Sequence, residues 1–262
     1  MGASLAVSSA APSVPTLPAI SPASPASQLV RVLPPLEGLF PQGGLQKGTV
    51  VTTGGKAPGA GSLALALIAA VTQDGGWAAV VGWPSIGLVA AAEMGVSLER
   101  LALVPDPGGR WLSVVAALVD GVEVLLVLPP ARVREPDARR LAARARERGC
   151  VLVVGPGSLL WPEGADVRLS VETAIWEGLA AGHGHLQGRM VEVAAAGRRA
   201  AARERRLRLW MPHPEGRLAL VGAAAGLPAV PTQPTVPAGT AVPAVPAVPA
   251  SPVALGRRTS GA

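Results

Sequence analysis

The sequence is poor in the residues that build disulfides, metal sites and aromatic cores. Its 262 residues include one cysteine, three histidines, one phenylalanine and no tyrosine. A single cysteine excludes an intramolecular disulfide and any cysteine-rich zinc module. Cys150 precedes the apolar run Val151–Val154 and is expected to be a buried, inert thiol. His183 and His185 fall in a predicted turn without further ligands nearby, so we expect no metal site.

Lysine is also scarce. It occurs only at Lys47 and Lys56, so every other basic residue is an arginine. The formal net charge is +6, and alanine, glycine and proline are all abundant. This combination is typical of a GC-rich genome. The positive charge by itself is therefore weak support for a nucleic-acid partner.

Long apolar runs without a break are missing, although 49% of the residues are hydrophobic. The uncharged stretches 58–73 and 75–92 approach the length of a membrane-spanning helix, but glycine and proline interrupt both. The N-terminus lacks the basic region of a signal peptide. We expect a cytoplasmic protein with no membrane partner.

The two ends of the chain differ in composition from the middle. Residues 1–28 are rich in alanine, serine and proline, and residues 223–262 consist largely of Pro-Ala-Val repeats. Proline at this density removes backbone donors, and such segments bury too little to offset their ordering entropy. The composition predicts two disordered tails around one folded domain at 29–222.

Inside this domain, short apolar runs alternate with helical patterns. Near-continuous Val/Leu runs separated by helices predict an α/β fold with a mostly parallel sheet and helices on both faces. After residue 160 the connections shorten, which predicts an antiparallel C-terminal extension. Strands are expected at 49–52, 77–81, 101–104, 122–128, 151–154, 166–175, 189–194 and 205–211, and helices at 62–72, 88–94, 112–119 and 136–148.

A strand, a glycine-rich turn and a helix follow one another around residues 55–62, which is the layout of a phosphate-binding loop. Such a loop aims backbone N–H groups and a helix N-terminus at phosphate and adds a lysine and a metal-binding hydroxyl. The candidate cofactor-binding residues are Gly55, Gly59, Gly61 and Ser62.

The loop lacks its cation. Ala60 stands at the second glycine position and Gly61 at the lysine position, while Lys56 lies at the wrong end. A nucleotide hydrolase of this class also needs a carboxylate at the end of the strand at 122–128. That strand runs into Pro129-Pro130, and Asp120 and Glu123 lie at its other end. We expect no catalytic residues and no ATP hydrolysis. Weak ATP binding stays open, because a glycine turn at a helix start can hold an anion.

The order of these motifs resembles the RecA/recombinase core over about residues 35–211. The resemblance implies a RecA-like, P-loop-type fold, and the catalytic glutamate expected near Pro84 or Ser85 is missing. The segments that carry the resemblance are the lead-in Gly43–Gly48, the passage Trp77–Val81, Ala91–Val96 and Leu101, and the paired segments Val167–Ile175 and Met190–Met211.

The loops after the two central strands are short, at 129–135 and 155–164, where recombinases carry DNA-binding loops. A recombinase core without nucleotide residues and with trimmed loops resembles the actinobacterial ImuA-prime-type proteins, which are accessory members of a DNA-damage-inducible mutasome. The resemblance implies a non-catalytic role in translesion synthesis and mutagenesis. It also implies two partners, an ImuB-like inactive Y-family polymerase homologue and an error-prone C-family DNA polymerase. The alternatives are an ATP-dependent recombinase-like repair enzyme with a divergent loop and a DNA-binding module outside any mutasome.

The densest basic cluster lies near the end of the folded domain. It is a candidate surface for DNA or a protein partner, and a solvated hairpin is the alternative. In its last strand, Arg206 and Arg208 alternate with Leu207 and Leu209, which predicts one solvated face. The cluster comprises Arg198, Arg199, Arg203, Arg205, Arg206 and Arg208.

Overall fold

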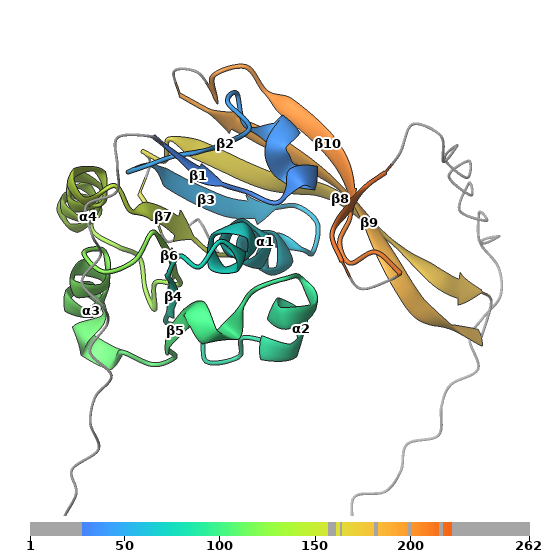
Figure 1. The fold of residues 1–262 in the computed structure, drawn as a ribbon, viewed down its shortest axis with the longest axis horizontal. Helices are drawn as coiled ribbons and strands as arrows, with labels where there is room; N and C mark the ends of the chain where they lie inside the picture. Colours follow the sequence, from blue (N-terminus) through green and yellow to red (C-terminus); the bar gives the residue numbers. More distant parts are fainter. Residues whose placement is uncertain are drawn as a thin grey trace, which may run out of the picture. The chain divides into compact units, whose positions relative to one another are not determined.

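A nine-stranded mixed sheet organises the computed structural model (Figure 1). The structure describes residues 28–156, 161–162, 164–180, 183–198, 201–214 and 217–221, all of which fall in one compact unit. The strand order is β11-β10-β9-β8-β3-β7-β6-β4-β5. Parallel neighbours cannot be joined by a tight hairpin, and a helix lies between each two successive strands from β3 to β7, as the alternating pattern predicted.

The strands from β8 to β5 in this order are parallel to one another. Three of the central strands, β4, β6 and β7, are buried along their whole length, because side chains on both of their faces are covered. The α/β prediction with a mostly parallel sheet is confirmed. The bounds are β3 (Val50–Gly55), β4 (Ala78–Val81), β5 (Leu101–Val104), β6 (Val124–Val127), β7 (Val151–Val154) and β8 (Val167–Ala180).

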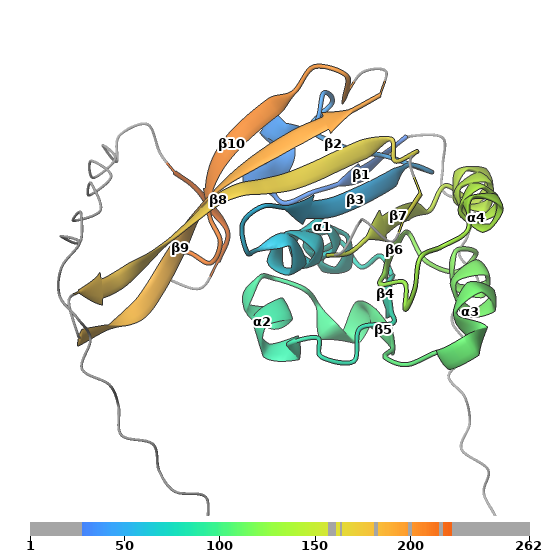
Figure 2. The ribbon, with the colours of Figure 1, turned by 180° about the vertical axis from the view of Figure 1, so that it is seen from behind.

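Helices flank the parallel part on both sides. Figures 1 and 2 show α1 (Ala60–Gln73) and α2 (Leu88–Glu93) on one side and α3 (Trp111–Leu118) and α4 (Glu135–Arg148) on the other. Each side has its own apolar cluster, and α1 is so central that its residues 63–72 are all buried. Within the described ranges, no helix combines the length and apolar character needed to cross a membrane.

The ends of α4 follow from its sequence. Pro136 lies in the first turn, where its missing N–H costs nothing, and Asp137 complements the positive end of the helix dipole. Leu141 and Ala145 face the sheet. Gly149 ends the helix in the left-handed conformation, with φ of +72°, as predicted.

The C-terminal part extends the sheet with antiparallel strands, as predicted. β8 pairs with β9 (His183–Gly197), β9 with β10 (Arg205–Trp210), and β10 with β11 (Ala219–Leu220). β8 and β9 are longer than expected, and both histidines predicted to lie in a turn belong to β9. Register shifts near Glu172 and Gly178 break the two-residue alternation, so the pattern did not show these lengths.

The lead-in to the sheet contains structure that the sequence pattern did not predict. β1 (Leu29–Arg31) and β2 (Gly44–Gln46) form a small antiparallel sheet around the 3-10 helix η1 (Pro34–Leu39). Strands of three residues are too short to show a periodic pattern. Two further 3-10 turns are η2 (Leu98–Arg100) and η3 (Gly108–Arg110).

The thiol of Cys150 should be unreactive in the folded protein. Cys150 is 1% exposed, and burial raises its pKa to about 12, so the reactive thiolate is scarce at pH 8. We expect iodoacetamide to label it only after unfolding in guanidinium chloride. An Arg139→Cys variant provides an exposed thiol on α4 as the control. Native labelling of Cys150 at the rate of this control would contradict the burial.

Candidate functional site

The predicted phosphate loop lies at the carboxyl edge of the parallel strands, where open α/β sheets bind their ligands. β3 runs up to Gly55, and α1 begins at Ala60, so the loop connects the central strand to the central helix. Gly55, Gly59, Gly61 and Ser62 lie on this connection and on the first turn of α1. What surrounds them differs from a phosphate site.

Two of the glycines are required by their backbone conformation and by adjacent segments of the same chain. Gly55 has φ of +133°, and a Cβ there would lie 2.2 Å from the carbonyl oxygen of Val171 in β8. Gly59 has φ of +134°, and a Cβ there would lie 3.3 Å from Nη2 of Arg189. Side chains are disfavoured at both positions for reasons of backbone conformation and packing. Their presence therefore does not require a bound phosphate.

Gly61 is covered by an indole ring. A Cβ on Gly61 would lie 3.0 Å from Cη2 of Trp83 and 3.9 Å from Cγ of Pro156. Trp83 follows β4, close to the position where the resemblance expects a catalytic glutamate, and it packs against the main apolar cluster. The tryptophan therefore packs over the first turn of α1, where the lysine of a phosphate loop would begin.

A cation does reach the loop, from a strand far away in the sequence. Arg189 of β9 is 7% exposed, and its Nη2 donates a hydrogen bond to Oγ of Ser62 over 3.1 Å. Its Nε donates to the carbonyl oxygen of Met211, and its guanidinium lies 5.0 Å from the ring centroid of Trp176. The hydroxyl that would bind a metal ion in a phosphate loop instead accepts a hydrogen bond from this arginine.

Arg189 has no carboxylate partner within the described part of the chain. Burial lowers the pKa of Arg189, because desolvation penalises the charged form. An arginine nevertheless stays protonated in a protein, and here the two oxygen acceptors and the ring face compensate its charge. The carboxyl edge of the sheet therefore holds a fixed positive charge.

The group at the end of β6 is also used within the protein. The carbonyl oxygen of Leu128, just after β6, accepts a hydrogen bond from Nε1 of Trp111 over 3.0 Å. Among the residues that the structure describes, no three His, Cys, Asp or Glu side chains gather to hold a metal ion. The described residues at the loop therefore do not fit the magnesium ion of a bound nucleotide.

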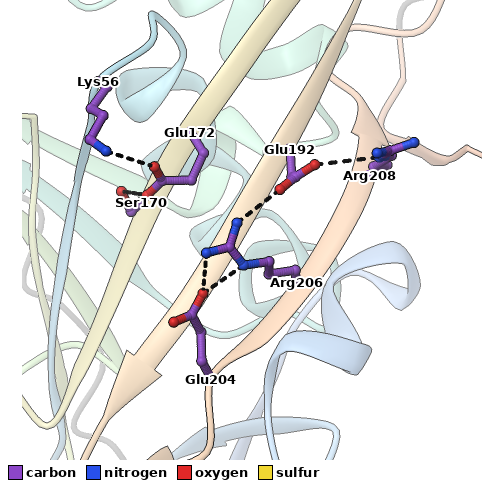
Figure 3. Close-up of polar contacts among 7 residues, drawn as sticks. All are labelled: Lys56, Ser170, Glu172, Glu192, Glu204, Arg206 and Arg208. Atoms are coloured by element: carbon purple, nitrogen blue, oxygen red, sulfur yellow. Dashed lines mark hydrogen bonds and ion pairs between the residues drawn. The ribbon is translucent and has the colours of Figure 1, made fainter.

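The arginine cluster is only partly a single surface. Arg206 and Arg208 lie on one exposed face of β10, as their alternation predicted. Nη1 of Arg206 lies 3.1 Å from Oε1 of Glu192, and Nε of Arg208 lies 3.4 Å from Oε2 of the same residue. Arg206 also donates a hydrogen bond to Glu204 (Figure 3). The hydrogen bond from Arg206 to Glu204, and then that to Glu192, raises the pKa of Arg206. These carboxylates offset much of the charge that a DNA surface would need.

Three other arginines of the cluster lie elsewhere. Arg203 is exposed, Arg205 is half-buried with Nη1 at 3.5 Å from the carbonyl oxygen of Arg203, and Arg198 lines a cavity beside α4. Arg199 lies outside the described residues. The cluster that is contiguous in sequence is therefore divided over separate places in the fold.

The same sheet face carries another ion pair, between Lys56 and Glu172. Nζ of Lys56 lies 3.8 Å from Oε2 of Glu172, and Oγ of Ser170 donates to the same carboxylate (Figure 3). The hydrogen bond from Ser170, and then the charge of Lys56, lower the pKa of Glu172. The side chain of Lys56 thus lies beside β8 and is 87% exposed.

Residues 38–163 match the family model of the MT3502 N-terminal domain. The chain is also 46% identical over 134 residues to the uncharacterized protein Rv3395c of Mycobacterium tuberculosis. That alignment covers 51% of this chain, and the chain spans 62% of the length of this curated relative. The region matched by the family model contains the loop and Trp83 but ends before β8, so Arg189 lies outside it. Neither name states an activity.

Sequence reasoning missed Arg189. It is one arginine in a chain rich in them, and 127 positions separate it from Ser62. No local motif marks it. The one signal in the sequence was the missing lysine of the loop. It suggests that another residue supplies a cation, but it does not identify that residue.

The packing of Trp83 on Gly61 can be measured by a double-mutant cycle. Alanine in a helix is favoured over glycine by about 1 kcal/mol. In a Trp83→Ala background, Gly61→Ala should therefore stabilise the protein. In the wild type the new methyl group meets the indole, so the same change should be less favourable by roughly 1 kcal/mol. Urea unfolding of the four variants gives this coupling, and Gly109→Ala, which has open space around it, is the control. Additive effects would contradict the contact.

Proposed function

We propose that the chain is a non-catalytic, RecA-like accessory protein in DNA-damage-induced translesion synthesis and mutagenesis, and that it acts through protein partners. One observation carries the proposal: the phosphate loop keeps its position at the end of β3 but is filled by the protein's own side chains. Arg189 binds Ser62, and Trp83 packs on Gly61. The parallel core with an antiparallel end supports the RecA-like part of the proposal.

Electrostatics argue against hydrolysis at this loop. A metal ion on Oγ of Ser62 would face the guanidinium of Arg189, which already donates to that oxygen. Two like unit charges 4 Å apart repel by roughly 4 kcal/mol at an effective dielectric constant of 20, and a divalent ion doubles this. No carboxylate at the end of β6 offsets this repulsion. The electrostatics therefore favour a structural role of the loop over a catalytic one.

The proposed partners are an ImuB-like inactive Y-family polymerase homologue and an error-prone C-family DNA polymerase. They come from the resemblance to ImuA-prime-type proteins. Because the residues that bind and hydrolyse a nucleotide are missing, we expect the chain to act through contacts made by its surface. The compensated charges of Arg206 and Arg208 favour protein partners over a direct role of this face in DNA binding.

The alternative is an ATP-dependent recombinase-like repair enzyme with a divergent loop. The observation that favours it is Arg189 itself, because this residue brings a cation to the loop. The two functions make opposite predictions for the same residues.

We expect no ATP hydrolysis, with or without single-stranded DNA, and no ATP-dependent rise in melting temperature. Gly61→Lys puts a lysine where a phosphate loop carries it. This variant should still not hydrolyse ATP, since Trp83 and Arg189 occupy the site. DNA-stimulated hydrolysis that disappears in both Ser62→Ala and Arg189→Met would refute the non-catalytic proposal and favour the alternative.

We expect the purified chain to form a complex with the ImuB-like protein in size-exclusion chromatography. The matched control is the same experiment with an active Y-family polymerase. The C-family polymerase is then added to test for a ternary complex. Failure to bind either protein, combined with DNA affinity that falls steeply with salt, would point instead to a DNA-binding module.

A further inference from the structure

A cavity of about 170 Å³ lies at the opposite end of β3 from the phosphate loop. Its walls come from the segment between η1 and β3, the last turn of α4, the start of β8 and the chain after β9. Gly48 lets the turn before β3 approach α4, because a Cβ there would lie 2.7 Å from Cα of Arg146. We call this cavity the Lys47 pocket and define it by Phe40, Leu45, Lys47, Arg146, Asp166 and Arg198.

The inner part of the Lys47 pocket is apolar. Phe40 and Leu45 are 4% and 1% exposed and belong to the main core cluster, as does Val167. An apolar cavity of about 150 Å³ can bind benzene, whereas pockets for drug-sized ligands begin at about 300 Å³. The volume therefore suits one aromatic or branched side chain and is too small for a nucleotide cofactor.

The rim of the Lys47 pocket is positively charged. Lys47, Arg146 and Arg198 line the pocket together with one carboxylate, that of Asp166, whose Oδ2 is 3.9 Å from Nη2 of Arg146. In the described ranges, the side chains of Lys47 and Arg198 have no carboxylate partner of their own. An apolar cavity with an excess of cations at its mouth matches a ligand with one apolar group and flanking negative charges.

The short strand β2 also lines the Lys47 pocket, through Gly44, Leu45 and Gln46. Among the described strands β2 pairs only with β1, so no described strand pairs with its other edge. An extended peptide can add to such an edge while alternate side chains enter a pocket beside it. The pocket and the edge together favour an extended protein segment over a small molecule.

We infer that the Lys47 pocket is the docking site for an acidic, extended segment of a protein partner that inserts one large apolar side chain. This rests on the proposed function, in which the chain acts by holding partners. DNA fits less well, since single-strand sites present exposed aromatic rings for stacking, whereas Phe40 is buried.

The test uses the full chain, labelled with ¹⁵N, and a capped peptide with one phenylalanine between pairs of aspartates. Two control peptides carry alanine in place of the phenylalanine or lysines in place of the aspartates. We expect only the first peptide to shift the amide signals of residues 44–49 and of Arg146. Lys47→Glu, and independently Arg198→Glu, should weaken its binding at least about tenfold. Arg139→Glu, on the same helix as Arg146 but outside the pocket, should change binding less than about twofold at physiological salt.

Several results would overturn the inference. Equal binding of the alanine peptide would show attraction by charge alone, and an equal effect of Arg139→Glu would show that the site is not the Lys47 pocket. Binding of an oligonucleotide at residues 44–49, lost in the same variants while the peptide does not bind, would assign the surface to DNA.

The peptide assay does not depend on polymerase proteins. Peptide binding without ImuB-like complex formation would keep the pocket and refute the proposed partners, and the reverse result would keep the partners and refute the pocket.

Discussion

Arg189 links the two halves of the sheet. From β9 in the antiparallel extension, its guanidinium reaches the first turn of α1, the central helix of the parallel half. A buried cation is costly unless its donors find acceptors and its charge is compensated. Oγ of Ser62, the carbonyl oxygen of Met211 and the face of Trp176 provide this compensation. The same interaction that joins the two parts of the sheet fills the loop where a phosphate would bind.

The sheet is covered unevenly, and this decides where its polar groups lie. α3 and α4 pack on the parallel strands, and their apolar cluster contains no residue of β8, β9 or β10. On that side the antiparallel strands face solvent, so charged side chains occupy it. Glu192 bridges Arg206 and Arg208 there, and Glu172 receives Lys56. Exposed pairs of this kind add little stability, but they lower the net charge of the face.

Sequence patterns predicted the parallel half well, since each Val/Leu strand and its helix carry their own periodic signal. α4 is the clearest example, because Pro136, Asp137 and Gly149 mark both of its ends. The antiparallel half was predicted in order but not in length. Bulges in β8 shift the alternation of side chains, and β9 continues through two histidines that a local pattern assigns to a turn. β1 and β2 are too short to give a pattern.

For the loop, the sequence by itself determined what is missing: Gly61 stands at the lysine position and no carboxylate follows β6. These are local facts, because a phosphate loop needs particular residues at particular spacings. Only the tertiary structure decided what takes their place. Arg189 reaches the loop from β9 and Trp83 from the segment after β4, and the Lys47 pocket joins segments from four parts of the chain. Contacts over such separations depend on strand order, which is set by packing of the whole domain and leaves no mark at a single position.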